Sequence, residues 1–368
     1  MSFPDVSGLY TVLSNPGKVL DDSFHLKLAA DWLLESQRVS GGTGYSHSYS
    51  LLSGWKPPYP ETSGYIISSM FSAFDMLEDP KYKNSAISAG EWILSIQNSD
   101  GSFSDLHGRP QVFDTGQIIY GLLELYSREK KAEYLDSAAK AGKWLCSVQE
   151  NDGSWIRFSY NQIPHTYYSR VGSILLALSK ETEDKYFWKS GMKNLDWVVS
   201  QQDESGYFSN MAFDSKSDPY LHTIVYVLEG LFHGFQLSGN KKLMKSVFVS
   251  SEKLNSLYSS EKTLFSQYSK GWVPANREQC VTGLAQWAGL TSELSQVSGE
   301  SQYLKNARST LDYLKAVQIT SGSANILGAL PSSIPVWGRY GRFSFFNWNA
   351  KFFIDAIVKY SKASEVEK

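Results

Sequence analysis

The sequence predicts an all-α fold in which six helical hairpins close into a double ring, an (α/α)6 toroid that forms one domain over residues 1–368. Three observations predict it. A repeat of roughly 50–60 residues runs along the chain. Each repeat holds one amphipathic and one almost wholly apolar helical pattern. Almost no segment has the pattern of a parallel β-sheet, although short strands are possible in the long loops before the apolar helices. Length alone suggests two domains at about 150 residues each, and the closed ring replaces that expectation.

The repeat is marked by a Trp or Tyr that is followed five residues later by Gln. The pairs are Trp32 and Gln37, Trp92 and Gln97, Trp144 and Gln149, Trp197 and Gln202, and Tyr313 and Gln318. The last interval between Gln residues is about twice the others, so a sixth, degenerate copy is expected near residue 258 in VSSEKLNSLYSS. The turns QNSDGSF, QENDGSW and QDESGYF follow three of the Gln residues, and their Gly supplies a positive φ.

Each unit contributes one outer and one inner helix. The outer helices are amphipathic and precede the Gln, as in 85–97 and 136–149. The inner helices follow a long loop, and because they are apolar nearly all round they are expected to be buried. They are expected at 61–77, 114–127, 169–180, 222–235, 278–294 and 347–361. The tail, 361–368, is expected to be a frayed and solvated end.

The near-neutral charge limits the class of function. The 35 Lys and Arg against 37 Asp and Glu give a net charge of −2, which excludes the basic footprint of a non-specific nucleic-acid binder. No membrane span is expected, because no long apolar stretch occurs. Cys146 and Cys280 lack metal-ligand spacing, so no metal or cofactor is predicted. No signal peptide is recognised, and a cytoplasmic protein is expected. The sequence does not indicate an oligomeric state.

The candidate site lies where the inner helices begin. All inner helices of such a ring run the same way, so their N-termini meet at one mouth, where unpaired N–H groups and helix dipoles favour an anionic or polyhydroxylated ligand. The residues at these starts are Glu61, Asp114, Arg170 with Tyr167 and Tyr168, His222, Gln279, and Asn347 with Lys351. Helix capping is the competing interpretation for Asp114, and it explains Glu61, Arg170 and His222 poorly.

The loops that lead to these starts are rich in aromatic residues, which make up 14% of the chain. Tyr and Trp combine an apolar face with a polar edge, which suits the C–H faces and hydroxyl rims of sugar rings. Arg at the same mouth suits carboxylates. Packing against the ring is the competing interpretation for any single residue. The candidate substrate-binding residues in these loops are Trp55, Tyr59, His165, Arg339, Arg342 and Trp348.

Helical hairpins with QxxDGSW-type turns resemble the six-hairpin and terpenoid-cyclase-like toroid group. That group includes terpene cyclases, protein prenyltransferase β-subunits, six-hairpin glycosidases, and the helical domains of uronate lyases and glucuronyl C5-epimerases. The segments YPETSGY (59–65), FDTGQ (113–117) and NWNAKFF (347–353) look like those of proteins from bacterial surface-polysaccharide and O-antigen clusters, labelled prenyltransferase/squalene-oxidase-repeat or polysaccharide-biosynthesis proteins. This resemblance implies a glycan substrate.

The terpene branches of the group are disfavoured by the sequence. A class II cyclase would need a DxDD acid motif, which is absent. A protein prenyltransferase would need an Asp/Cys/His zinc set. Cys280 and His222 begin inner helices, but the Asp-x-Cys spacing is missing.

Three functions remain. The first is a glycoside hydrolase, in which Glu61 acts as general acid and Asp114 as general base, with Arg170 and His222 binding substrate. Neighbouring helices pack about 8–10 Å apart, which would match the carboxyl separation of about 6.5–9.5 Å in inverting enzymes.

The second function is a uronate-directed C5-epimerase or lyase. Tyr167, Tyr168 or His222 would serve as base or acid, with Arg170, Arg339 or Arg342 as carboxylate clamp. The third is a non-catalytic toroid that holds a glycan or a lipid-linked intermediate.

Overall fold

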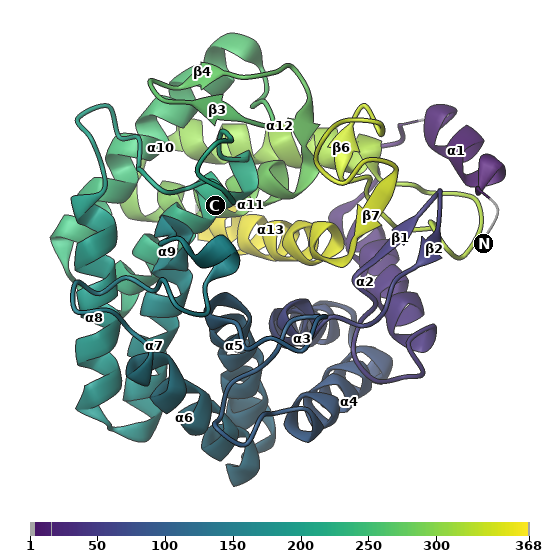
Figure 1. The fold of residues 1–368 in the computed structure, drawn as a ribbon. Helices are drawn as coiled ribbons and strands as arrows, with labels where there is room; N and C mark the ends of the chain where they lie inside the picture. Colours follow the sequence, from purple (N-terminus) through teal and green to yellow (C-terminus); the bar gives the residue numbers. More distant parts are fainter. Residues whose placement is uncertain (1–3, 16, 367–368) are drawn as a thin grey trace.

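The computed structural model describes residues 4–15 and 17–366, and within them two concentric rings of helices surround a common axis (Figure 1). The inner ring consists of α3 (Pro60–Leu77), α5 (Val112–Glu129), α7 (Ser169–Thr182), α9 (Leu221–Ser238), α11 (Val281–Ser298) and α13 (Asn347–Val366). The outer ring consists of α2 (Asp22–Arg38), α4 (Pro80–Ser95), α6 (Ala132–Ser147), α8 (Lys185–Ser200), α10 (Lys241–Glu261) and α12 (Ser301–Val317). The predicted all-α toroid is confirmed.

The inner ring closes on itself. Each inner helix contacts the next one along the chain, and α13 contacts both α11 and α3. The last inner helix also packs against α2, the first outer helix, so the two ends of the chain form the sixth helix pair. The other five pairs are tight hairpins in which the inner helix leads directly into the outer one.

The tight hairpins share one turn chemistry. The inner helices end in a left-handed residue, which is Glu78, Lys130, Glu183, Gly239 or Gly299. The following residue caps the outer helix, and in three hairpins its side chain accepts a backbone N–H: Asp79, Asp184 and Asn240. A left-handed C-cap followed at once by an N-cap reverses the chain in two residues. The long connections are therefore left at the opposite end, where the next inner helix begins.

The repeated Gln joins five of the six outer helices to the next one around the ring. The amide group of Gln97 donates to the carbonyl oxygens of Gly101 and Ser137, and its oxygen accepts from the Ser137 hydroxyl. Gln37, Gln149 and Gln202 make the same set of bonds to Ser85, Ser190 and Ser246. Gln318 bonds to His25 on α2 and closes the outer ring. The degenerate sixth copy is α10, as predicted.

Short strands occur in the loops at the mouth. Three strands, β1 (Ser48–Ser50), β2 (Gly54–Trp55) and β7 (Ser344–Phe346), form a sheet in the order β2-β1-β7, which ties the first mouth loop to the last. Two further pairs are β3 (Tyr268–Ser269) with β4 (Val273–Pro274) and β5 (Gln279–Cys280) with β6 (Ser333–Ile334).

Most predicted helix boundaries differ from the structure by a few residues, and three differences are informative. The inner helix expected from residue 278 begins at Val281, because the two preceding residues pair with β6. Helix α13 continues through Val366, so the tail expected to be frayed from 361 is helical to that residue, and 367–368 lie outside the described residues. The short helix α1 (Val6–Leu13) was not predicted. None of the described helices is long and apolar enough to cross a membrane.

Candidate functional site

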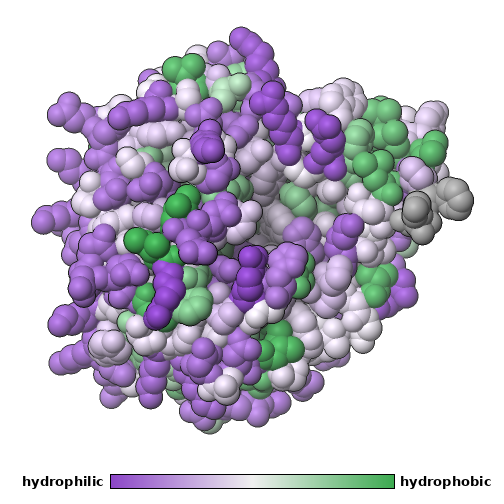
Figure 2. Space-filling view, viewed as in Figure 1, coloured by the Kyte–Doolittle hydropathy of each residue, from purple (hydrophilic) through white to green (hydrophobic). Residues whose placement is uncertain are grey.

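A cavity of about 540 Å³ opens at the mouth of the ring, where the inner helices begin. In Figure 2 it is the hollow near the centre of this face, with hydrophilic residues around its rim. Its walls come from the first turns of α3, α5 and α9, from the 3-10 turn Thr166–Tyr168 before α7, and from the long loops. The direction of the inner helices thus places the site where the sequence predicted it.

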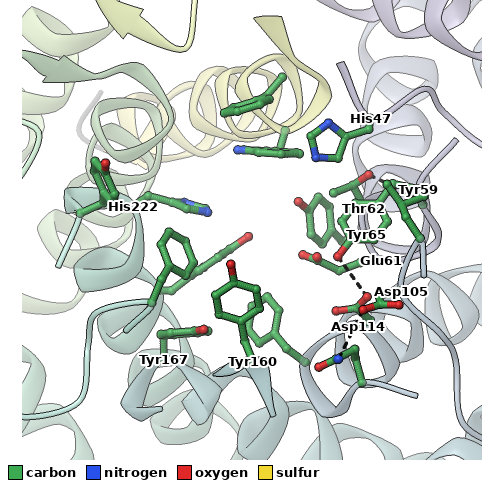
Figure 3. A pocket seen from close by; sticks show the side chains of 18 of the residues that line it. His47, Tyr59, Glu61, Thr62, Tyr65, Asp105, Asp114, Tyr160, Tyr167 and His222 are labelled. Carbon is green, nitrogen blue, oxygen red and sulfur yellow. Dashed lines mark hydrogen bonds between the residues drawn. The ribbon is translucent and has the colours of Figure 1, made fainter. Parts of the chain in front are cut away.

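Two carboxyl groups lie side by side in this cavity (Figure 3). Glu61 is the second residue of α3, and Asp114 is the third residue of α5. The hydroxyl of Tyr59 donates to Oδ2 of Asp114 at 3.1 Å. The same hydroxyl is near enough to Glu61 to lower the pKa of that carboxyl. Because α3 and α5 are adjacent in the ring, their first turns bring the two acids together.

Both acids hold their protons more tightly than free carboxyls do. Burial, and next the charge of Asp114, raise the pKa of Glu61 well above its ordinary value, and the Tyr59 hydroxyl offsets this in part. Burial also raises the pKa of Asp114 to about 7, against the lowering effect of the bond from Tyr59. A pair of carboxyls in which one holds its proton more tightly can divide the roles of acid and base.

Aromatic rings form most of the remaining wall. Phe113 stacks on Tyr168 with ring centroids 5.4 Å apart and meets Tyr167 edge-on at 5.2 Å. On the opposite side, Trp348 stacks on Phe346 at 4.1 Å. Such faces match the apolar faces of sugar rings.

His222 enters the cavity from the first turn of α9 as a neutral imidazole. Its Nδ1 lies 2.7 Å from Oε1 of Gln286. Burial lowers the pKa of His222 to about 3, and the nearby Arg170 adds to this. The ring therefore carries no charge near neutral pH.

The structure brings eight of the predicted site residues to the cavity and leaves seven elsewhere. Those that line it are Glu61, Asp114, His222, Tyr168, Tyr59, Tyr167, Arg339 and Trp348. Their roles remain predictions.

Arg170 is the most instructive of the seven misplaced residues. Its side chain is buried in the ring interior between the rings of Tyr120 and Tyr226. Nη1 pairs with Glu229 at 2.9 Å, and Nε donates to Gln117. The guanidinium is thus paired within the protein and does not line the cavity at the mouth, which argues against the predicted role as a clamp for a substrate carboxylate there.

The other misplaced residues are also held by neighbours. Both ring nitrogens of His165 lie against backbone carbonyls, of Ala212 and Tyr160. Lys351 pairs with Asp355 and lines a second, smaller cavity of about 220 Å³ deeper in the ring.

Three of them are fixed in loops or at a helix start. Trp55 packs on Trp32, and its indole N–H donates to Asn325. Gln279, in strand β5, bonds to Thr263 and Tyr313. The Asn347 amide joins Ser46 to Thr62.

Arg342, the last of the seven, lies on the surface and donates to the carbonyl of Trp337. None of these seven side chains lines the cavity at the mouth.

The sequence analysis missed part of the lining. Tyr65 and Tyr226 form the floor, each four residues after a predicted start residue, Glu61 or His222. Residues four apart share one helix face, so this spacing was a usable signal. His47, which packs against Tyr59 and Trp348, also lines the cavity and was not among the predicted site residues.

Comparisons with known proteins agree with this architecture. The family model of the squalene-hopene cyclase C-terminal domain matches residues 56–232. A squalene–hopene cyclase of Zymomonas mobilis is 24% identical over 218 residues, which cover 54% of this chain and 32% of that protein. The chain therefore spans about a third of the length of this relative.

Solved structures match over nearly the whole chain. An unsaturated glucuronyl hydrolase specific for heparin superposes with a TM-score of 0.73 at 11% identity, over 94% of this chain and 98% of that one. The cellobiose 2-epimerase of Bacillus thermoamylovorans gives a TM-score of 0.70 at 15% identity, over 89% and 95%. A polysaccharide lyase gives 0.67 at 13% identity, over 94% and 98%. The chain therefore has an α/α toroid fold like that of these solved structures.

Proposed function

We propose that this protein is a glycoside hydrolase that cleaves an oligosaccharide or polysaccharide at the mouth of the ring. One observation carries the proposal: Glu61 and Asp114 meet at a shared tyrosine hydroxyl inside a cavity walled by aromatic rings. Two carboxyls flanking the scissile bond are the chemical requirement of most glycosidases.

Glu61 acts as the general acid. Burial raises the pKa of Glu61 well above its ordinary value and so favours the protonated form, which donates its proton to the oxygen of the leaving sugar. Asp114 acts as the general base and takes a proton from the attacking water. The charge of Asp114 helps to raise the pKa of Glu61, which supports Glu61 as the acid of the pair.

The cavity supports a sugar as ligand. Its volume of about 540 Å³ lies within the range of roughly 300–1,000 Å³ that small-molecule sites occupy. The aromatic wall offers stacking faces, while the carboxyls, tyrosine hydroxyls and His222 offer polar partners. The solved structures of similar fold include enzymes named for glucuronyl, cellobiose and polysaccharide substrates.

A uronate-directed epimerase or lyase is less well supported. It would need a cation on the substrate carboxylate. In the described part of the chain, the Arg residues that line the cavity are Arg109 and Arg339, and the structure has no lining Lys. Arg109 pairs with Asp105 at 2.8 Å, and Arg339 lies 3.8 Å from Glu278. A bound uronate would instead face the two acids.

We also propose that the substrate belongs to bacterial surface-polysaccharide metabolism, such as O-antigen assembly, in the cytoplasm. This part of the proposal rests on the resemblance of the segments 59–65, 113–117 and 347–353 to proteins of such clusters. A glycan carried on a lipid would be one form of that substrate.

The test is turnover of defined glycans. The full-length protein is incubated with unsaturated glucuronyl disaccharides, cellobiose and surface-polysaccharide fragments, and new reducing ends are measured. Glu61→Gln and Asp114→Asn are each expected to lower kcat about 10²–10⁴-fold. Asp203→Asn, at an exposed position outside the cavity, is the control and is expected to keep most activity.

The alternatives give different results. Undiminished activity in both variants would contradict the assignment of acid and base. Solvent deuterium at C5 of a uronate, without cleavage, would instead identify an epimerase. Binding of these glycans without turnover by the wild type would identify a binding toroid.

A further inference from the structure

A chain of hydrogen bonds leads from the cavity wall into the interior of the ring. Oε1 of Gln286 lies 2.7 Å from Nδ1 of His222, and Nε2 of Gln286 donates to Oε2 of Glu229 at 3.1 Å. The same carboxylate oxygen accepts from Nη1 of Arg170 at 2.9 Å. These side chains are all buried, with Gln286 only 1% exposed. We call Gln286, Glu229 and Arg170 the His222 relay.

The relay has a fixed direction. Arg170 keeps its charge under all ordinary conditions, and the Glu229 carboxylate beside it can only accept hydrogen bonds. Gln286 must therefore turn its NH2 group towards Glu229 and its carbonyl oxygen towards His222. A carbonyl oxygen can only accept, so the proton of the neutral imidazole sits on Nδ1, and Nε2 is left as an acceptor.

The free nitrogen faces the site. Figure 3 shows the ring of His222 directed into the cavity, and the ring packs on Tyr226 with centroids 4.2 Å apart. Among the described residues, no side chain or backbone group makes a hydrogen bond with Nε2. The low pKa of His222, which results from burial and from Arg170, keeps this nitrogen unprotonated near neutral pH.

We propose that the relay holds His222 as a hydrogen-bond acceptor for a hydroxyl group of the bound sugar, so that this position selects a neutral hydroxyl over a carboxylate. A hydroxyl has a proton to donate to Nε2, whereas an ionised carboxylate would bring its lone pairs against that of the nitrogen. Gln286 and Glu229 are positioning residues in this account. The identity of the ligand rests on the proposed function, but the protonation pattern of His222 does not.

Nitrogen NMR of the full-length protein labelled with ¹⁵N-histidine tests the relay. The chain has six His residues, and the signals of His222 are assigned by their loss in His222→Gln. We expect the Nδ1–H form, unchanged between about pH 5 and about pH 8. An imidazolium signal in that range, or the Nε2–H form, would overturn the inference.

A variant pair shows whether Gln286 is responsible. Gln286→Met keeps a similar volume but removes the amide, and it is expected to shift His222 towards the Nε2–H form. Gln236→Met, at an exposed position on the same ring, is the control and should leave the His222 signals unchanged. Unchanged signals in Gln286→Met would refute the positioning role. If that variant does not fold, the wild-type spectrum still decides the protonation pattern.

The role in binding is tested on the glycan that the wild type hydrolyses. His222→Phe keeps a ring without an acceptor and is expected to lower kcat/KM about tenfold or more, because the sugar hydroxyl loses its partner. His222→Gln retains an acceptor oxygen and should lose less. Equal activity of the Phe variant and wild type would overturn this role. Absence of any turnover would refute the hydrolase alone, because the NMR result stands independently of it.

Discussion

The burial of Asp114 predicts a measurable cost to stability that depends on pH. Its pKa is about 7 in the folded protein, against 3.8 for an unperturbed Asp. A tenfold change in proton affinity is worth about 1.4 kcal/mol, so the ionised carboxyl costs the folded state about 4 kcal/mol above neutral pH. Because the folded pKa is the higher one, this stability is present below pH 3.8 and is lost as the pH rises through about 7.

Asp114→Asn removes this dependence. At about pH 5 the cost is about 2 kcal/mol, and at about pH 8 it is about 4 kcal/mol. The free energy of unfolding of the wild type is therefore expected to fall by roughly 2–3 kcal/mol relative to Asp114→Asn between these two pH values. The variant also lowers the pKa of Glu61, because the charge of Asp114 helps to raise it. This second effect changes the stability difference between wild type and Asp114→Asn in the same direction.

Urea unfolding of both proteins at the two pH values provides the measurement. Asp203→Asn is the control: hydrogen bonds from Ser205 and Tyr207 outweigh the effect of burial and lower the pKa of this exposed carboxyl. The stability that it contributes is lost only as the pH falls through the folded pKa, so the stability difference between wild type and the control should stay constant from about pH 5 to about pH 8. If the difference in the free energy of unfolding between wild type and Asp114→Asn also stays constant between the two pH values, the argument from burial is refuted.

Three further predictions concern the rings and the reaction. Gln202→Ala breaks the hydrogen bonds to α10, so it should lower the free energy of unfolding in urea by about 1–3 kcal/mol. Substitution of its surface neighbour, Gln201→Ala, should change this free energy by less than about 0.5 kcal/mol. Gly121→Ala should destabilise the protein by about 2 kcal/mol or more in thermal unfolding, since its Cβ would lie 2.0 Å from the α3 backbone. In Gly289→Ala the new Cβ would lie 3.3 Å from the Lys359 side chain and 3.6 Å from Cα of Ala356, so this variant should be nearly neutral or stabilising. The pH profile of kcat/KM should rise through about pH 7 as Asp114 ionises, and Asp114→Asn should lose that limb; a limb that persists in the variant would assign it to another group.

The fold was predictable because its signals are local and repeated. The Trp-to-Gln spacing recurs along the chain, and the wholly apolar helices can only lie inside the ring. Gly64 was also interpretable as a point of close helix packing, and a Cβ there would lie 2.6 Å from the Cα of Ile118.

The site was predictable only in part. Glu61 and Asp114 could be placed at one mouth, since parallel inner helices bring their first turns together. The ion pair of Arg170 could not be predicted in the same way, because its partner Glu229 lies on the neighbouring helix α9, far away in the sequence. The sequence predicts the backbone position of a charged residue at a helix start. Whether its charge is available to a ligand depends on which side chains pack around it in the folded protein.

The central claim, hydrolysis by the Glu61 and Asp114 pair, is tested most directly by the fate of solvent oxygen. The protein is allowed to act on the glycan in ¹⁸O-labelled water, and the first products are analysed by mass spectrometry. We predict cleavage with one labelled oxygen in the products, lost together with activity in Glu61→Gln and Asp114→Asn but not in Asp203→Asn. Cleavage without the label, or label incorporation that survives both substitutions, would contradict the account.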